Sequence, residues 1–490
     1  MNMNMKKIQL ITFSLLTAIL MGGCGNDWMD LQPSTEIETE GSLTELRDFE
    51  FVLNGAYSGM QSSSYYGATM MCYGDLTGDD MKCYKSSSTN VSYYTFKYNK
   101  TNGPSGFWSV YYGIAKNLNI LLRDIDRIEL VPDRVIITPK MEKLTEQVYH
   151  DDLKGEALAI RALMLFDMTR LYGYPYLKDN GASLAVPIMD NVVDDKNIKP
   201  SRNTTAECYK RIIEDLTEAV GLLRPVKKEG KINKWAAMTL LSRVYLYKGE
   251  DSEAYKVATE AIKGAEKQGY RLWTNEEYAK IWATPFNSEL LFEIVNLTTD
   301  SPGKSSIGYI CTKYNMIATD KYWKKYLKGK SKDVRRQMVS AASSKKPYCL
   351  KYPAQGDKSY EDANVPVFRL SELYLNAAEA AVKNNDITNA RAYLKPVYAR
   401  TGEDLDDLAD KSITLDLVLE QRRIEFWGEG QRFFDLIRNN RKVERKDYLS
   451  EVPEEARSFD WNCYKIVLPV PIHEMEYNEN MVQNPEYEQH

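Results

Sequence analysis

The sequence predicts a mainly α-helical protein in which stacked helical pairs, similar to tetratricopeptide units, form a scaffold. Three observations support this fold class. Long segments repeat apolar residues at helical spacing, two helical pairs match each other at equivalent offsets, and a loop-rich region with short strands lies between these pairs. The composition, 43% hydrophobic and 27% charged, indicates a globular chain that can bury a large core.

Residues 1–23 have the pattern of a lipoprotein signal peptide. Two lysines precede an uncharged apolar run at residues 8–21, which is too short to span about 30 Å of hydrocarbon. Two glycines and Cys24 follow, and this ending resembles the lipobox that is cleaved and acylated in bacterial lipoproteins. We therefore expect a lipidated Cys24 and a flexible tether over residues 24–42. The alternative is an ordinary secretory signal in which Cys24 has no role.

The folded body is expected to be a single domain over residues 43–490. Helical patterns occur at residues 43–60, 106–128 and 154–172. The third pattern, GEALAIRALMLFDMTRLYG, is apolar on nearly every side, which indicates a helix packed between other helices.

Two segments match each other as tetratricopeptide-like units. The first covers residues 235–262 and the second covers residues 374–394, with Gly249 and Asn385 at equivalent turn positions. Both residue types accept the left-handed conformation that ends a helix. A weaker unit is expected between Lys154 and Leu223. We expect helical repeats over about 154–262 and 368–438, and these repeats should stack because one unit cannot bury its own faces.

Residues 263–366 are expected to form a loop-rich insert. Four prolines, serine-rich stretches and short apolar runs such as LLFEIV interrupt the helical pattern there. Long loops on a rigid scaffold often determine specificity.

Two polar clusters leave alternatives open. Cys72 and Cys83 are close enough in sequence to form a disulfide in an exported protein, but unpaired buried thiols are an equal alternative. Asp75, Asp79 and Asp80 could be interpreted as a calcium loop, but they lack the EF-hand offsets, so a solvated or capping acidic loop is favoured.

Charge and motifs exclude several classes of function. The formal net charge of −5 provides no basic excess for nucleic acid. The three histidines lack HExxH spacing, and no GxSxG, Walker A or GxGxxG motif occurs, so no cofactor is expected. Gly428-Glu429-Gly430 lies in a helix-like charged segment and does not follow a strand, as the glycines of a dinucleotide-binding motif would. A carboxylate pair for glycoside hydrolysis depends on a separation in space that sequence does not give. We expect a binding protein and not an enzyme.

Three segments together resemble the SusD/RagB family of outer-membrane nutrient-binding lipoproteins of Bacteroidetes. They are FRLSELYLNAAEA at 368–380, EQRRIEFWGEGQRFFDLIR at 420–438 and YKIVLPVPIHEMEYNENMVQNPEY at 464–487. With the lipobox and further matches, the resemblance extends from Cys24 to the end of the chain.

The resemblance implies a surface lipoprotein anchored in the outer membrane through Cys24 and facing the cell exterior. Such a protein captures an oligosaccharide or polysaccharide and delivers it to a SusC-like TonB-dependent transporter. Capture of peptides by the same architecture is the main alternative. A helical-repeat adaptor without its own ligand is a further alternative.

The charged residues of these segments are interpreted as scaffold. Arg422 lies on an otherwise apolar helix face and requires a buried partner, for which Glu425 is a candidate. Arg369 and Glu372, three residues apart, are interpreted in the same way.

We expect the ligand to bind aromatic residues in loops at residues 65–98 and 309–323. Tyrosines there lie among Ser, Gly, Thr and Asn, so helical packing does not obviously explain them. A flat ring beneath a sugar and polar groups around it are the chemistry that such a ligand needs. The predicted ligand residues are Tyr84, Asn90, Tyr93, Tyr94, Tyr314 and Trp323.

Overall fold

The predicted central helix is the longest in the structure. The computed structural model describes residues 43–189, 198–313, 315–328, 332–340 and 346–487, all within one compact unit, Leu43–His490. Helix α6 (Glu146–Tyr172) is buried around almost its whole circumference, as its sequence predicts. It begins eight residues earlier than expected, because the Thr145 hydroxyl accepts a hydrogen bond from the Val148 N–H and caps the helix.

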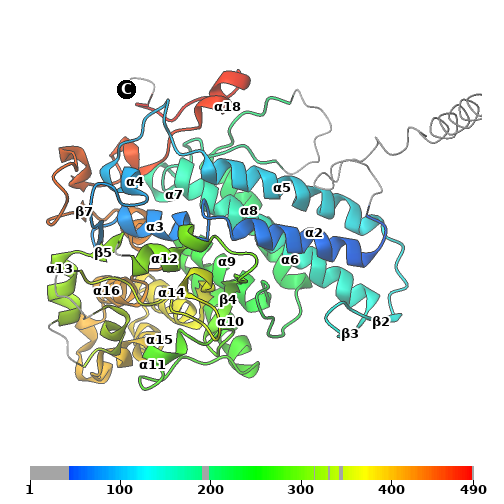
Figure 1. The fold of residues 1–490 in the computed structure, drawn as a ribbon. Coiled ribbons are helices and arrows are strands. Elements are labelled where there is room, and N and C mark those ends of the chain that lie inside the picture. Colours follow the sequence, from blue (N-terminus) through cyan, green and yellow to red (C-terminus); the bar gives the residue numbers. More distant parts are fainter. Residues whose placement is uncertain (1–42, 190–197, 314, 329–331, 341–345, 488–490) are drawn as a thin grey trace, which may run out of the picture. The chain divides into compact units, whose positions relative to one another are not determined.

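Three helices pack along α6 (Figure 1). They are α2 (Leu46–Met60), α5 (Gly106–Asp124) and α8 (Thr205–Leu222). The first two confirm the helical patterns predicted for these segments. Helix α8 starts with a capping box, in which Thr204 and Glu207 satisfy each other's backbone N–H groups.

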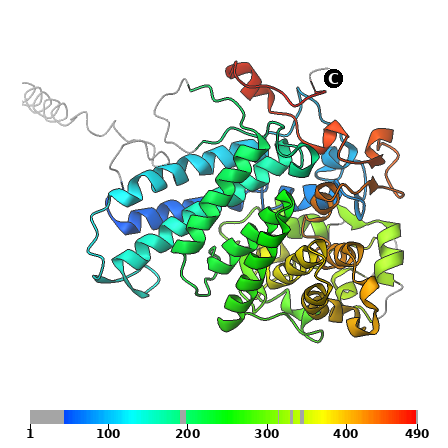
Figure 2. The same ribbon diagram turned by 180° about the vertical axis from the view of Figure 1, so that it is seen from behind.

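The two predicted tetratricopeptide-like units are present and stack on each other. The first unit consists of α9 (Lys234–Lys248) and α10 (Asp251–Lys267), and the second of α14 (Leu370–Lys383) and α15 (Ile387–Tyr398). Gly249 and Asn385 have φ of 80° and 60°, which confirms the left-handed turns expected from sequence. Helices α10 and α14 join the two units, and small residues such as Ala254 and Ala380 permit their close approach (Figures 1 and 2).

The described strands form four two-stranded antiparallel sheets. The pairs are β1 (Met81–Cys83) with β5 (Met316–Ala318), β2 (Val135–Ile137) with β3 (Lys143–Thr145), β4 (Leu290–Ile294) with β6 (Val365–Arg369), and β7 (Val443–Glu444) with β8 (Ser458–Phe459). The β4–β6 pair connects the interior of the loop-rich insert to its C-terminal end, and the β1–β5 pair joins that insert to the N-terminal third of the chain. The mainly α-helical fold class is confirmed.

Short helices occupy the remaining segments. They are α3 (Thr69–Leu76), α4 (Val91–Thr95), α7 (Tyr176–Asp179), α11 (Tyr278–Ile281), α12 (Ile307–Thr312), α13 (Asp320–Tyr322), α16 (Leu415–Glu425), α17 (Arg432–Arg438) and α18 (Ile472–Tyr477). The prediction of a helix-like segment around Gly428 was wrong. Gly428 and Gly430 have φ of 83° and 69°, so the chain makes a tight turn between α16 and α17.

Within the described residues, no helix is both long and apolar enough to cross a membrane. The expected lipid attachment at Cys24 and its tether lie outside the described residues. Cys72 and Cys83 are both buried as free thiols, so the disulfide considered for them is absent and the alternative of unpaired thiols holds.

Candidate ligand-binding surface

Charged residues of the segments that resemble the SusD/RagB family form a buried ion-pair network. The Arg369 guanidinium donates hydrogen bonds to Glu289 at 2.7 Å, to Glu425 at 2.8 Å and to Glu429 at 2.8 Å. Arg400 shares Glu289 and Glu425 with Arg369. These cations hold the pKa of Glu425 well below its usual range despite its complete burial. The interpretation of these residues as scaffold therefore agrees with their contacts.

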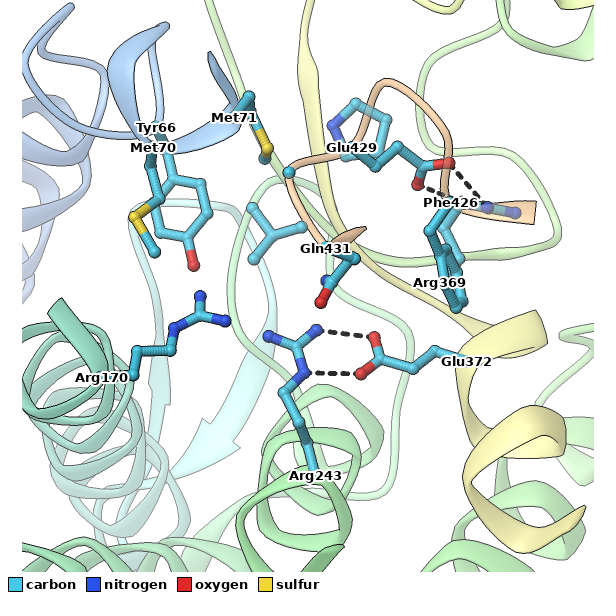
Figure 3. A pocket seen from close by; sticks show the side chains of 13 residues that line it. Tyr66, Met70, Met71, Arg170, Arg243, Arg369, Glu372, Phe426, Glu429 and Gln431 are labelled. Atoms are coloured by element: carbon cyan, nitrogen blue, oxygen red, sulfur yellow. Dashed lines mark hydrogen bonds and ion pairs between the residues drawn. The ribbon is translucent and has the colours of Figure 1, made fainter. Parts of the chain in front are cut away.

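The ion-pair partners expected from sequence spacing were wrong. Arg422 contacts Asp435 at 3.2 Å and Glu379 at 3.7 Å, and not Glu425. Glu372 pairs with Arg243 at 2.6 Å, and not with Arg369 (Figure 3). Residues three apart on one helix can form an ion pair. In a stacked fold, side chains from neighbouring helices can also approach a charged residue and pair with it at shorter distances.

The cavity beside this network is too small for a nutrient. It lies between Tyr66, Arg170, Arg243 and Arg369 and has a volume of about 10 Å³, which fits one water molecule (Figure 3). Arg369 and its glutamate partners therefore stabilise the interior and do not form a ligand site.

The acidic loop that precedes β1 is neither solvated nor a metal site. Asp79 and Asp80 are buried and form ion pairs with Arg423 and Arg432. Asp75 is also buried, and burial raises the pKa of its carboxyl to about 8. The described residues contain no group of three or more side chains that could hold a metal ion. The favoured expectation of a solvated or capping loop was therefore wrong.

The two central tyrosines of the predicted ligand site are buried in the core. The Tyr93 ring packs edge-on against Tyr73 at a centroid distance of 5.3 Å, and only 7% of Tyr93 is exposed. Tyr94 is 1% exposed and lies beneath the Arg445 guanidinium at 4.8 Å. Neither ring can support a ligand, so the prediction that these rings are exposed was wrong.

Two neighbouring tyrosines and Asn90 also face inward. Tyr65 and Tyr66 both donate hydrogen bonds to the buried Asp167, at 2.6 and 2.9 Å. Asn90 has φ of 63° and starts α4, and its side chain is half-buried beside the Cys72 thiol. The short helix α4 therefore anchors this loop in the core.

Tyr84 and Trp323 remain as candidates from the sequence prediction. Tyr84 directly follows β1, is 37% exposed, and has the Lys346 ammonium 4.4 Å from its ring centroid. Trp323 begins the π-helix η4 (Trp323–Lys328) and is half-buried. Tyr314 lies outside the described residues. Because β1 pairs with β5, the two loop segments that carry these rings lie side by side.

A third segment completes this region, and the sequence prediction missed it. Asp447 accepts a hydrogen bond from the Asp320 N–H at 2.9 Å and forms an ion pair with Lys82. Its neighbour Tyr448 is 37% exposed. Figure 1 shows α13, β5, β7 and α4 at the same edge of the fold. More than three hundred residues separate Lys82 from Asp447, so no local sequence signal could have indicated this contact.

We call Tyr84, Trp323 and Tyr448 the aromatic surface. Polar groups that suit sugar hydroxyls lie next to these rings, including Ser86, which donates a hydrogen bond to Glu451 at 2.7 Å. The arrangement provides platforms and hydrogen-bonding groups, both of which carbohydrate recognition needs.

Three larger hollows lie on the described part of the fold. A cleft of about 400 Å³ between α2, α6 and residues 224–231 is lined by equal numbers of acidic and basic side chains. Lys228, for example, contacts both Asp152 and Glu156 at 2.8 Å. A groove of about 650 Å³ lies beside the β2–β3 hairpin, and another of about 500 Å³ lies between η4, α16 and α17. None of the three hollows is lined by Tyr84 or Trp323.

Two family models together match most of the chain. The model described as the SusD family matches residues 273–487. The model described as starch-binding associating with outer membrane matches residues 27–246.

Solved structures agree with these matches. A Bacteroides vulgatus protein for which sugar binding has been proposed is 47% identical with a TM-score of 0.85, and the match covers 91% of this chain and 100% of that chain. A SusD superfamily protein of the same species is 34% identical with a TM-score of 0.81 and the same coverage. A laminarin-binding SusD-like protein shares the fold at 21% identity, with a TM-score of 0.70 and coverage of 91% and 100%.

The mainly helical fold with stacked helical pairs is that of the SusD-like class of proteins. The chain belongs to the SusD/RagB family.

Proposed function

We propose that this protein captures an oligosaccharide or polysaccharide on the aromatic surface. Three rings from segments that are distant in sequence lie at one edge of the fold, where Tyr84 and Tyr448 are exposed and Trp323 is half-buried, and this observation supports the proposal most directly. The β1–β5 pairing and Asp447 connect those segments. Each ring can stack against the C–H face of a sugar, while Lys82 and Ser86 offer polar groups to its hydroxyls. Sugar-related descriptions of the family and of similar structures support the same class of ligand.

Binding without catalysis fits the charges of this region. Glycoside hydrolysis needs two carboxyl groups about 5 to 10 Å apart, of which one must be protonated to act as an acid. Two carboxylates beside the aromatic surface, Asp320 and Asp447, form ion pairs with Lys324 and Lys82, and a third, Glu451, accepts a hydrogen bond from Ser86. Nearby lysines keep the pKa of Asp447 below its usual value, so it is a poor proton donor at neutral pH.

We also propose delivery of the ligand to a SusC-like TonB-dependent transporter. In this proposal the protein is anchored through Cys24, faces the cell exterior, and docks on the transporter through its stacked helical pairs. The lipobox-like ending at Cys24 and the family description of association with the outer membrane support it. Cell fractionation of C24A tests the anchor, because undiminished membrane retention would contradict it. Pull-down from mild detergent should recover a large barrel transporter, and recovery of the protein alone would contradict delivery.

Ligand capture is tested with the full-length chain in a detergent that has no sugar headgroup, such as octaethylene glycol monododecyl ether. Affinity electrophoresis against a polysaccharide panel should show retarded migration of the wild type. The triple variant Y84A/W323A/Y448A should lose retardation without a change in melting temperature. Y477A removes a ring that is 78% exposed on α18 and serves as the control. Retention of peptides alone would support the peptide alternative, and unchanged retardation of the triple variant would exclude this surface.

A further inference from the structure

Positive charge is concentrated in two of the segments that build the aromatic surface. Residues 313–351 contain twelve Lys and Arg and only two Asp, although the formal net charge of the chain is −5. Residues 81–100 contain four lysines and no acidic residue. The rest of the chain is therefore strongly acidic, and the β1–β5 pair brings the two basic segments together.

Some of these cations have structural roles and are not available to a ligand. Arg335 is buried against Asp333 at 2.7 Å, and Lys351 is buried against Glu429. These pairs account for the buried members of the basic segments. Among the described lysines of these segments, Lys85, Lys324, Lys325 and Lys328 are exposed.

The π-helix η4 explains how lysines are directed outward. Tyr322 and Tyr326 point into the core, where Tyr322 stacks on Trp427 at 5.7 Å and Tyr326 accepts a hydrogen bond from Arg423 at 2.9 Å. With these two rings fixed inside, the lysines at the intervening and following positions face solvent. Such π-helical turns often occur at functional sites.

We define the lysine surface by six residues of α13, η4 and the β1 segment. These are Lys82, Lys85, Lys321, Lys324, Lys325 and Lys328. Within the described part of the chain, two carboxylates form ion pairs with these lysines, since Lys82 pairs with Asp447 and Lys324 contacts Asp320 at 3.3 Å. Lys85 and Lys328 are exposed and make no ion pair among those of the described residues. Like charges on such a surface repel one another, and a bound polyanion relieves this repulsion.

We propose that the glycan captured by this protein is an anionic polysaccharide, whose carboxylate or sulfate groups bind the lysine surface while its sugar rings stack on the aromatic surface. This inference rests on the proposed function. Lys82 and Lys324 flank Asp447 and Asp320, which tie the two surfaces together, and Lys346 lies directly over the Tyr84 ring. Anionic lipid would use the cations alone, whereas the exposed rings favour a carbohydrate.

The test compares matched acidic and neutral polymers with the full-length protein in the same sugar-free detergent. The probes are polygalacturonate with its fully methyl-esterified form, and dextran sulfate with dextran, measured by affinity electrophoresis. We expect at least one acidic polymer to bind about tenfold or more tightly than its neutral counterpart at low salt, and this advantage to shrink at 0.5 M NaCl because salt screens exposed charges.

Two lysine variants separate a specific surface from general attraction. K85Q/K324Q/K328Q should weaken binding of the acidic polymer by about tenfold, as expected from three modest exposed charge contacts. K256Q/K263Q/K267Q removes three exposed lysines of α10 and should leave binding unchanged. Equal losses in both variants would show attraction by net charge only and would overturn the inference.

Other binding results would distinguish failure of the anionic-ligand inference from failure of the proposed function. Retention of neutral polymers alone would overturn the anionic ligand and leave the proposed function standing. Retention of peptides but of no polysaccharide would overturn both. Vesicles of phosphatidylcholine with and without phosphatidylglycerol serve as the membrane comparison, because both accept the lipid anchor equally. Lysine-dependent preference for the anionic vesicles, without binding of any acidic polymer, would identify a membrane-facing surface and overturn the inference.

Discussion

A carboxyl oxygen of Asp75 accepts a hydrogen bond from the backbone N–H of Gly430 at 3.0 Å, although 355 residues separate the two in sequence. The backbones touch at this point, because a Cβ atom added to the neighbouring Gly74 would overlap the Gly430 carbonyl. The segment around residues 74–81 and the segment 420–438, which carries part of the family resemblance, therefore meet through glycine and a buried carboxyl. Their distinctive residues are explained by this close packing.

Gly74→Ala should destabilise the fold by about 1 to 3 kcal/mol, because an added methyl group must displace backbone and not a flexible side chain. Gly113→Ala in α5 is the control, since no atom lies within 4 Å of the position of its added Cβ. There the substitution should be neutral or stabilising by up to about 1 kcal/mol. Urea denaturation of the two variants compares them directly. Equal stabilities would show that the backbones can separate freely.

The buried Asp75 should make stability depend on pH. Burial raises the pKa of its carboxyl from 3.8 to about 8, so the folded state keeps a proton that the unfolded state releases above about pH 4. Stability from this group is complete below pH 4 and is lost as pH rises toward 8. Asp75→Asn does not titrate and keeps an oxygen for the Gly430 N–H.

We therefore expect D75N to gain about 3 kcal/mol of stability relative to the wild type between pH 5 and pH 8. The measurement is the difference in unfolding free energy between the two proteins at each pH, which cancels the titration of other groups. D357N, which changes an exposed carboxylate, should follow the wild type across the same range. A difference that does not vary with pH would mean that Asp75 is ionised in the folded protein.

The Arg369 network should be essential to folding. Arg369→Met leaves Glu289, Glu425 and Glu429 buried with one cation fewer, and removal of one partner from a buried pair costs about 3 to 5 kcal/mol. Arg271→Met removes a half-exposed pair with Glu277 and should cost less than about 1 kcal/mol. Thermal unfolding or the yield of folded protein measures both. Equal effects of the two variants would contradict a stabilising role of the network.

Helical periodicity predicted much of the scaffold, because the period and the turn residues are local signals. The burial of α6 and the left-handed turns at Gly249 and Asn385 follow directly from neighbouring residues. The partners of Arg422 and Arg369 could not be predicted in this way, since they come from helices that are distant in sequence.

The ligand surface was harder to predict for the same reason. The residues around Tyr93 and Tyr94 have the composition of an exposed loop, but Arg445, from the C-terminal part of the chain, covers Tyr94 and donates a hydrogen bond to its carbonyl at 2.6 Å. Tyr84 has similar neighbours in sequence and remains accessible. Composition alone therefore cannot separate a covered loop from a free one.

Tyr93→Ala and Tyr84→Ala should therefore have opposite effects on stability and on ligand binding. Tyr93 packs against Tyr73, Tyr98 and Phe107, so its truncation leaves a cavity and should cost about 3 to 5 kcal/mol. Tyr84 is 37% exposed, and its truncation should change stability by no more than about 0.5 kcal/mol. Differential scanning calorimetry measures both, and affinity electrophoresis should show weaker glycan retention for Y84A than for Tyr93→Phe, which keeps the packed ring. If Y93A melts like the wild type and Y84A binds like it, the burial that distinguishes these two rings does not determine their roles.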